Sequence, residues 1–193
     1  MFQPFSGMDS SFTTAIFDHF SKTSSNSIFI LPEEDLPEAS YVEVKKRYSA
    51  DSIISFLRKR GREAGQKFVG LTAADIETSI VGKKHWGIMG LGYCPGNAAV
   101  ISTKRLKRGN PTHAVLVSRA INVCLHEVGH NFSLPHCGNT ICVMVAANGG
   151  LPADTIGRFC SNCLQTLHQK GWKYRQPPTT YSQHTENKEK KTG

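Results

Sequence analysis

The sequence predicts a compact α/β domain, with a mixed sheet of about four to five strands packed on two main helices. Three observations lead to this class. A chain of 193 residues is long enough for one domain with one hydrophobic core. Hydrophobic residues make up 39% of it and charged residues 20%, which is an ordinary globular balance. Segments with strand periodicity alternate with segments of helical periodicity, which is typical of mixed sheets.

Five short segments have the residue pattern of strands. They are apolar and β-branched, or they alternate apolar with polar side chains, and proline or glycine occurs at or near the ends of most of them. In chain order they are residues 27–32, 41–44, 68–72, 86–93 and 97–103. The third segment (FVGLT) is expected to be a buried strand, whereas the second alternates as a half-buried strand does.

Helical periodicity marks the two main helices. After Ser49, a suitable N-cap, apolar residues recur at helical spacing up to Gly61, and basic residues in the last turn complement the helix dipole. Asn110 and Pro111 are interpreted as the cap and first turn of the second helix. Its apolar stripe continues to about Phe132, so this helix is predicted to carry the residues with the clearest chemistry.

The carboxyl-terminal part has a different character. Prolines and glycines interrupt any long period between residues 134 and 158, so loops are expected there. A short helix is predicted at residues 161–168, and the polar tail 176–193 is expected to be disordered. The chain is thus divided into one domain, 1–175, with an amino-terminal subdomain of about 1–132 and a carboxyl-terminal subdomain 133–175.

The formal charge of +8 and the isoelectric point near 9.3 could indicate nucleic acid, an anionic membrane surface or acidic peptides as partners. The basic runs lack interleaved aromatic residues, so a solvated surface is favoured and no nucleic acid is expected. No apolar run approaches the length of about 20 residues that spans a membrane, and the amino terminus lacks a secretory pattern. A cytoplasmic location without membrane partners is expected, with a monomer as the default.

The strongest motif occurs at residues 126–136. His126 and His130 are four residues apart (HEVGH) within the second predicted helix, so their imidazoles share one face and can reach one ion. His136 follows Pro135, which cannot continue the helix, and is predicted to return as a third ligand. Three neutral nitrogen ligands are typical of catalytic zinc, because they leave one tetrahedral position to water.

Glu127 adjoins His126 without being a predicted ligand. Zinc lowers the pKa of a bound water from ~15.7 to about 7 and polarises a substrate carbonyl. Glu127 is predicted to take the proton of this zinc-bound water and pass it to the leaving amine, which hydrolyses a peptide without a covalent intermediate. An HExxH string can also arise by chance on a surface helix, but the third histidine, the apolar helix and a methionine downstream disfavour that alternative.

Four of the six cysteines occur in two close pairs. Cys137 with Cys142, and Cys160 with Cys163 (CxxC), form the ligand set of a closed structural zinc site, which would hold the loop-rich segment in place. A redox pair at Cys160 and Cys163 is an alternative, as are unrelated buried thiols, but a redox pair leaves the other two cysteines without a partner. Cys124 lies on the apolar stripe and is a predicted core residue.

The motif HEVGHNFSLPHC, followed by CxM and CxxC, resembles the archaemetzincin family, a branch of the metzincin clan of zinc peptidases. The resemblance spans about residues 27–175. It implies a metzincin-like fold, makes 1–175 the catalytic domain and implies a second zinc next to the catalytic one. It also implies that Met144 lies on a turn beneath the catalytic zinc, where the alternative is a methionine that only fills core space. Residues 97–103 would form an exposed edge strand along the cleft.

One position departs from the metzincin pattern. Metzincins usually have glycine three residues after the second histidine, where this sequence has Ser133. If the backbone there needs a positive φ angle, serine costs on the order of 1 kcal/mol relative to glycine. The expected consequence is a perturbed bend between the second and third histidines.

The function predicted from these motifs is a zinc-dependent metallopeptidase (a metalloprotease, hence a hydrolase) that acts on a peptide or protein substrate, as an endopeptidase or an aminopeptidase. The alternative is a zinc-binding module with little or latent peptidase activity, against which the carboxylate of Glu127 beside an open metal position argues. Nucleic-acid binding ranks last, because the basic residues are not gathered around the cysteine motif.

Overall fold

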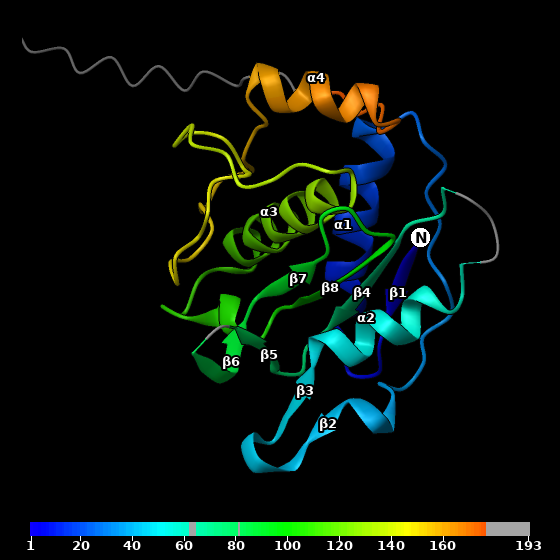
Figure 1. The fold of residues 1–193 in the computed structure, drawn as a ribbon, viewed down its shortest axis with the longest axis vertical. Helices are drawn as coiled ribbons and strands as arrows, with labels where there is room; N and C mark the ends of the chain where they lie inside the picture. Colours follow the sequence, from blue (N-terminus) through cyan, green and yellow to red (C-terminus); the bar gives the residue numbers. More distant parts are fainter. Residues whose placement is uncertain (62–64, 81, 177–193) are drawn as a thin grey trace, which may run out of the picture.

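Two four-stranded sheets organise the computed structural model, which describes residues 1–61, 65–80 and 82–176 (Figure 1). The first sheet has the order β1-β4-β8-β7, with strands Phe2–Pro4, Phe68–Thr72, Ala98–Ser102 and Gly90–Gly92. The second has the order β2-β3-β5-β6, with strands Tyr41–Val42, Arg47–Ser49, Ile76–Ile80 and Lys83–Ile88. The predicted α/β class is confirmed, with the strands divided between two sheets instead of one.

Helices cover both faces of the first sheet. α1 (Ser10–Thr23) and α3 (His113–Asn131) pack on one face, and α2 (Ala50–Arg58) packs on the other (Figure 1). Side chains of β8 alternate accordingly, with Ile101 in the core shared with α3 and Val100 in the core shared with α2. β1, β4 and β8 run parallel while β7 is antiparallel to β8, so this sheet is mixed.

Capping side chains define where the main helices begin. The predicted N-cap Ser49 is confirmed, because its side chain accepts from the Ser52 N–H at 3.2 Å. The predicted cap of α3 at Asn110 is wrong, since the Thr112 side chain caps this helix instead. Asn110 has a φ of +49°, which places it in the left-handed turn before the helix.

The amino-terminal segment contains α1 and β1, which were not predicted. Asp9 caps α1 by accepting from the Ser11 N–H at 2.8 Å, and Phe12, Ile16 and Phe20 recur at helical spacing on its buried face. Conversely, the strand predicted at residues 27–32 is reduced to an isolated bridge between Phe2 and Ile30. The segment runs beside β1 without a continuous ladder.

β8 corrects the expectation of an exposed edge strand at residues 97–103. It lies between β4 and β7, and all its residues are buried. β7, with the sequence GLG, forms the edge instead. The physical reason is side-chain size, because a Cβ on Gly92 would lie 2.5 Å from the carbonyl oxygen of Glu127 in α3. Only glycine allows a strand to approach α3 this closely.

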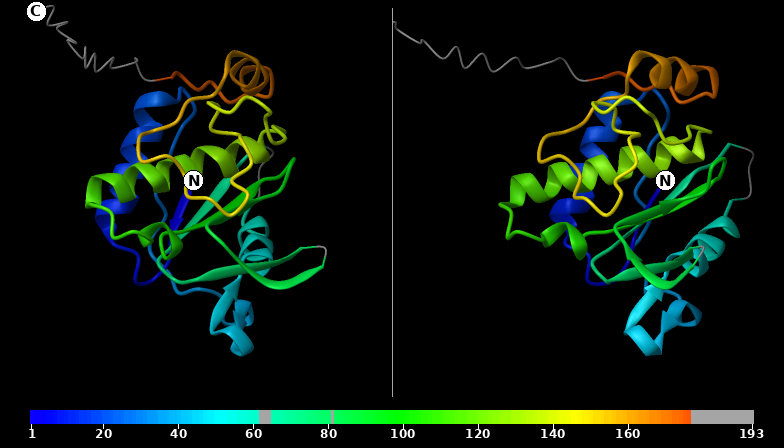
Figure 2. Two further views of the ribbon diagram at one scale, coloured as in Figure 1. Left: turned by 90° about the vertical axis from the view of Figure 1, so that its left-hand side faces the viewer. Right: turned by 60° about the vertical axis from the view of Figure 1, so that its left-hand side comes forward.

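The carboxyl-terminal segment is irregular but packed. Between α3 and α4 (Ser161–Gln169) the chain forms no helix or extended strand and runs across α3, which both views of Figure 2 show. The predicted loops and short helix are confirmed. Leu134, Met144 and Phe159 join α1 and α3 side chains in one core. The predicted disordered tail lies outside the described residues, apart from Gln176. Among the described helices, none is both long and apolar enough to cross a bilayer.

Candidate metal centre

The α3 helix places His126 and His130 one turn apart, with their rings perpendicular and their centroids 4.6 Å apart. The Nδ1 atom of His126 lies 2.8 Å from the Val143 carbonyl oxygen, and that of His130 lies 2.7 Å from the Leu134 carbonyl oxygen. A carbonyl oxygen only accepts, so Nδ1 carries the proton on both rings and each neutral Nε2 presents a lone pair. These two Nε2 atoms are 3.1 Å apart. They cannot donate to each other, so a cation bound between them would make this close approach favourable.

The ionisation of both rings agrees with this interpretation. Burial, together with the neighbouring His130 and His136, lowers the pKa of His126 to about 4, against the opposing effect of the Val143 carbonyl. Burial also lowers the pKa of His130. Both imidazoles are therefore neutral at physiological pH, which is the form that binds a metal ion.

His136 completes the group after the chain turns back. Its ring centroid is 5.3 Å from that of His126 and 5.0 Å from that of His130. The potential ligand atoms of the three histidines all lie within 4.8 Å of one another. Nitrogen ligands at about 2.0–2.1 Å from a tetrahedral zinc are roughly 3.3 Å apart, so the closest pair already has nearly the spacing that zinc needs.

The turn that returns the chain is a Schellman motif at the end of α3. The Leu134 N–H donates to the Gly129 carbonyl at 3.0 Å, and the Ser133 N–H donates to the His130 carbonyl at 2.9 Å. Ser133 has a φ of +71°, which confirms that this position needs the left-handed conformation. The Leu134 carbonyl that follows accepts from His130, so the same turn also orients this ring.

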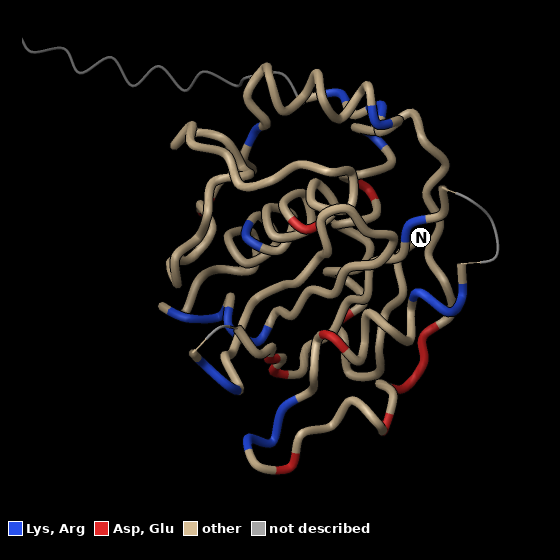
Figure 3. The backbone as a smooth tube through the Cα atoms, in the orientation of Figure 1, with Lys and Arg blue, Asp and Glu red and all other residues tan. Residues whose placement is uncertain are grey.

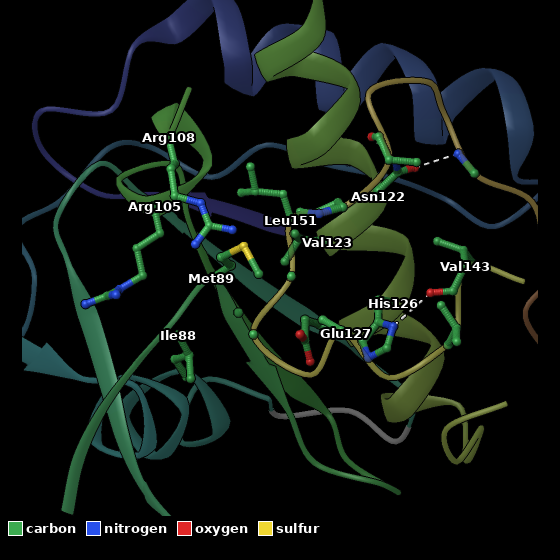
Figure 4. A pocket seen from close by; sticks show the side chains of 18 of the residues that line it. Ile88, Met89, Arg105, Arg108, Asn122, Val123, His126, Glu127, Val143 and Leu151 are labelled. Carbon is green, nitrogen blue, oxygen red and sulfur yellow. Dashed lines mark hydrogen bonds between the residues drawn. The ribbon is translucent and has the colours of Figure 1, made fainter. Parts of the chain in front are cut away.

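Glu127 lies beside the histidines at the cleft wall, where Figure 4 shows its carboxyl group next to the His126 ring. Its side chain is 8% exposed. Burial raises the pKa of Glu127 to about 8, while a hydrogen bond from the Gly92 backbone has the opposite effect. A cation held by the histidines would favour the charged carboxylate. A Cβ on Gly90 would lie 2.9 Å from Oε1, so the glycines of β7 leave the space that this carboxyl group occupies.

Met144 packs under α3 at the level of the HExxH motif. It is fully buried, and its carbonyl accepts from the Cys137 N–H at 2.9 Å. A Cβ on Gly129 would lie 2.5 Å from the Met144 sulfur, so glycine at the fourth position of HEVGH is what allows this contact. The role of Gly129 was missed in the sequence analysis, although its place between the two histidines was a signal that could have indicated it.

A cleft with a volume of about 1060 Å³ opens in front of His126, His136 and Glu127. One wall comes from β6 and β7, and the other from residues 140–157. Asn122 fixes the second wall to α3 by donating to the Ala153 and Thr155 carbonyls, each at 2.9 Å. This positioning role was also missed, because no sequence signal relates an asparagine on a helix to a distant loop.

The four paired cysteines form a second group behind the histidines. Their sulfur atoms lie within 4.8 Å of one another, and those of Cys137 and Cys160 are 3.8 Å apart. Four thiolates at about 2.3 Å from a tetrahedral zinc would be about 3.8 Å apart, so the set fits this ion. Backbone N–H groups of Cys160 and Asn139 point at the sulfurs of Cys142 and Cys137, as they do around thiolate ligands.

All six cysteines have free thiols. Burial raises the pKa of Cys142 and Cys163, whereas the Cys163 backbone N–H lowers the pKa of Cys160 to about 7. Cys124 is buried in the core, as predicted, and Cys94 is exposed away from the group. The structure therefore separates the four clustered cysteines from the other two.

Comparisons with known proteins agree with these features. The model of peptidase family M54 matches residues 31–169. The archaemetzincin of Haloquadratum walsbyi is 32% identical over 144 residues, which cover 70% of this chain and 80% of that protein. The crystal structure of archaemetzincin from Archaeoglobus fulgidus, complexed with malonate, has 25% sequence identity and a TM-score of 0.69, and the match covers 86% of this chain and 97% of that one.

A zinc-dependent peptidase from Methanocorpusculum labreanum shares the fold, with a TM-score of 0.68 at 18% identity. That match covers 86% of this chain and all of the other. The family match extends over most of the described chain, from the strands before α2 to the end of α4, and so includes both the histidine and the cysteine groups. The chain therefore belongs to peptidase family M54, the archaemetzincins, and is a zinc metallopeptidase.

Proposed function

We propose that the cleft is the peptidase active site, with one zinc ion held by His126, His130 and His136. A second zinc is held by the four clustered cysteines, Cys137, Cys142, Cys160 and Cys163. The observation that carries the first assignment is the pair of Nε2 lone pairs 3.1 Å apart, fixed by two Nδ1 hydrogen bonds to carbonyl oxygens. The observation that supports the second is a set of free sulfurs at the spacing of tetrahedral thiolates.

Zinc, when bound, supplies Lewis-acid polarisation of the scissile carbonyl and makes water a better nucleophile. Glu127 accepts the proton of the attacking water and then donates it to the leaving amine, so the carboxyl group ends each cycle ionised as it began. Its surroundings support this double role, because burial favours the protonated form whereas a cation at the histidines favours the carboxylate that takes the first proton. Met144 supports the histidines from below through its contact with Gly129.

The substrate chain binds along the exposed edge of β7. An edge strand has unpaired main-chain groups, so an extended peptide can pair with it while its carbonyl lies in front of the histidines. Gly90 lines the cleft next to Glu127 and brings this edge close to the reacting groups. Residues 140–157 form the opposite wall of the cleft.

The test is Glu127→Gln, which keeps the size of the side chain and removes its basicity. We expect kcat to fall by about 10²- to 10⁴-fold on a peptide library, with the zinc content measured by mass spectrometry still at two ions per chain. The matched control is Glu43→Gln, at an exposed position on the turn Glu43–Lys45. Wild-type hydrolysis by Glu127→Gln would refute the mechanism, and absence of hydrolysis by the zinc-loaded wild type would favour a zinc-binding module instead.

A further inference from the structure

The cleft extends beyond the histidines to a strongly basic end. Its lining includes five lysine and arginine side chains, whereas Glu127 is the one carboxylate among the described lining residues. Four of these basic residues belong to a single turn, which we call the basic turn: Lys104, Arg105, Lys107 and Arg108. This turn leads into α3, and Figure 3 shows lysine and arginine positions along it.

Part of this charge is already neutralised within the protein. Arg105 donates to both carboxyl oxygens of Asp75, at 2.7 and 2.9 Å, and Arg47 from β3 donates to the same carboxylate at 2.7 Å. Two guanidinium groups thus share one carboxylate, which leaves a positive surplus. A Cβ on Gly87 would lie 1.9 Å from the Arg105 Nη2, so β6 has a glycine where this guanidinium crosses it.

Arg108 and Lys104 have no such compensation. Their side chains are exposed and form no hydrogen bond or ion pair with any other described residue. The backbone of the basic turn is nevertheless fixed, because the buried guanidinium of Arg119 donates to the carbonyls of Leu106 and Arg108 at 2.8 and 2.9 Å. An ordered turn with uncompensated cations facing a cleft is suited to binding an anion from the substrate.

An apolar passage connects this basic end to the reacting groups. In Figure 4, Val123, Met89 and Leu151 lie between the His126 and Glu127 side chains and Arg108. Arg119, which holds the basic turn, precedes His126 by seven residues on α3, or about 10 Å at 1.5 Å per residue. An extended peptide covers this distance in about three residues. The apolar section favours a peptide over a nucleic-acid backbone, whose charges would lie against Val123 and Met89.

We propose that the basic turn selects peptides that carry a carboxylate about three residues from the scissile bond, bound mainly by Arg108. The carboxylate is an aspartate or glutamate side chain, or the carboxyl terminus of a short peptide. This inference rests on the proposed active site, and it adds the class of substrate.

The experiment uses zinc-loaded protein and quenched fluorescent peptides that are acetylated and amidated. Glutamate is placed at each position in turn and compared with glutamine. A second arm compares the free carboxyl terminus with the amide at increasing distance from the scissile bond. We expect at least about tenfold higher kcat/KM for the carboxylate in one register, as for a charged hydrogen bond in a cleft. The preference should shrink when salt is raised from about 0.05 to 0.5 M.

Variants identify the responsible cation. Arg108→Gln should reduce the preference for glutamate over glutamine to less than about threefold, and Arg108→Glu should reverse it in favour of lysine. The matched control is Arg58→Gln, an exposed arginine in the last turn of α2 that does not line the cleft, and it should keep the wild-type preference. Binding of the same peptides to zinc-loaded Glu127→Gln, measured by fluorescence anisotropy, provides a readout that does not depend on turnover.

The outcomes separate the two proposals. If no peptide is hydrolysed but glutamate peptides bind at least about tenfold more tightly in one register, the proposed peptidase function fails and the carboxylate site stands. Equal binding and equal hydrolysis of glutamate and glutamine peptides at every position would overturn the carboxylate site alone. Displacement of a bound acidic peptide by an equally charged single-stranded oligonucleotide at the same concentration would also overturn it, in favour of a nucleic-acid surface.

Discussion

The histidine and cysteine groups are adjacent in the chain, since Cys137 follows His136, but they are built differently. Two histidines stand on α3, where helical spacing and hydrogen bonds to carbonyl oxygens orient their rings. The four cysteines come from the irregular segment between α3 and α4 and from the start of α4. His126 and His136 line the cleft, whereas only Cys142 of the four cysteines does so.

Under the proposed assignment, metal plays two different roles in this one small domain. A helix is stabilised by its own backbone bonds and by burial, so its ligands are ordered before an ion arrives. An irregular segment has neither, and the binding free energy of the ion then becomes part of its folding free energy. The histidine group should therefore survive without zinc, while the cysteine group should not.

The largest effect is expected when the cysteine group is removed. Cys160→Ser combined with Cys163→Ser should reduce the zinc content from two ions per chain to one and unfold the segment between α3 and α4. Structural zinc supplies on the order of 10 kcal/mol in zinc-finger peptides, so a marked loss of thermal stability should follow. Metal analysis and calorimetry measure both effects. The control is Cys94→Ser, at an exposed cysteine outside the group, which should change neither the zinc content nor the thermal stability. A zinc content that is unchanged in the double variant would exclude the cysteine site.

The pH dependence of zinc affinity should differ between the two groups. Without metal, burial raises the pKa of Cys142 and Cys163, so both thiols are protonated at neutral pH and zinc must displace their protons. Zinc displaces at least these two protons, so affinity at the cysteines should fall at least about 100-fold per pH unit on acidification, or roughly 2.7 kcal/mol or more. The pKa of His126 is lowered to about 4, so its ring releases no proton to zinc above about pH 5. Chelator competition on proteins that keep one group each measures the slopes, and equal slopes would contradict this difference.

A methyl group inside the histidine motif should disturb the active site without removing the fold. Gly129→Ala places a Cβ about 2.5 Å from the buried Met144 sulfur, and such overpacking costs about 2 kcal/mol. Activity should fall while the cysteine zinc remains, because the strain acts on the floor of the histidine group. Introduced into Met144→Ala, the Gly129→Ala change should cost less stability than it does in the wild type, because the sulfur that its Cβ meets is gone. An equal cost in both backgrounds would show that this contact is not responsible.

The smallest effect is expected at the turn that joins the two groups. Ser133 has a φ of +71°, so Ser133→Gly should raise the free energy of unfolding by about 1 kcal/mol, or Tm by about 3 °C. Ser133→Ala should give no such gain, since alanine has the same Cβ. Comparing these two variants tests whether serine, in place of the usual glycine at this position, does nothing more than strain the bend. A lower stability for Ser133→Gly would show that the serine side chain contributes something else.

Local patterns predicted much of this protein. Ser49 as a cap, the buried strand at residues 68–72 and the stripe of α3 were readable because they depend on neighbours within a few residues. The identity of the edge strand could not be predicted from local patterns. Residues 97–103 and the glycine strand β7 both have strand-like sequences, and which of them lies at the edge depends on their packing against α3.

The sequence by itself determined the chemistry: an HExxH helix with a third histidine, four paired cysteines, a methionine between them and the family to which these motifs belong. Only the tertiary structure decided how they are used. It showed that His126 and His130 direct their lone pairs at each other and that Asn122 and Arg119 hold distant loops. It also joined the basic turn to the cleft. The physical reason is that ligand type follows from residue identity, whereas orientation, burial and uncompensated charge arise only when segments far apart in the chain pack together.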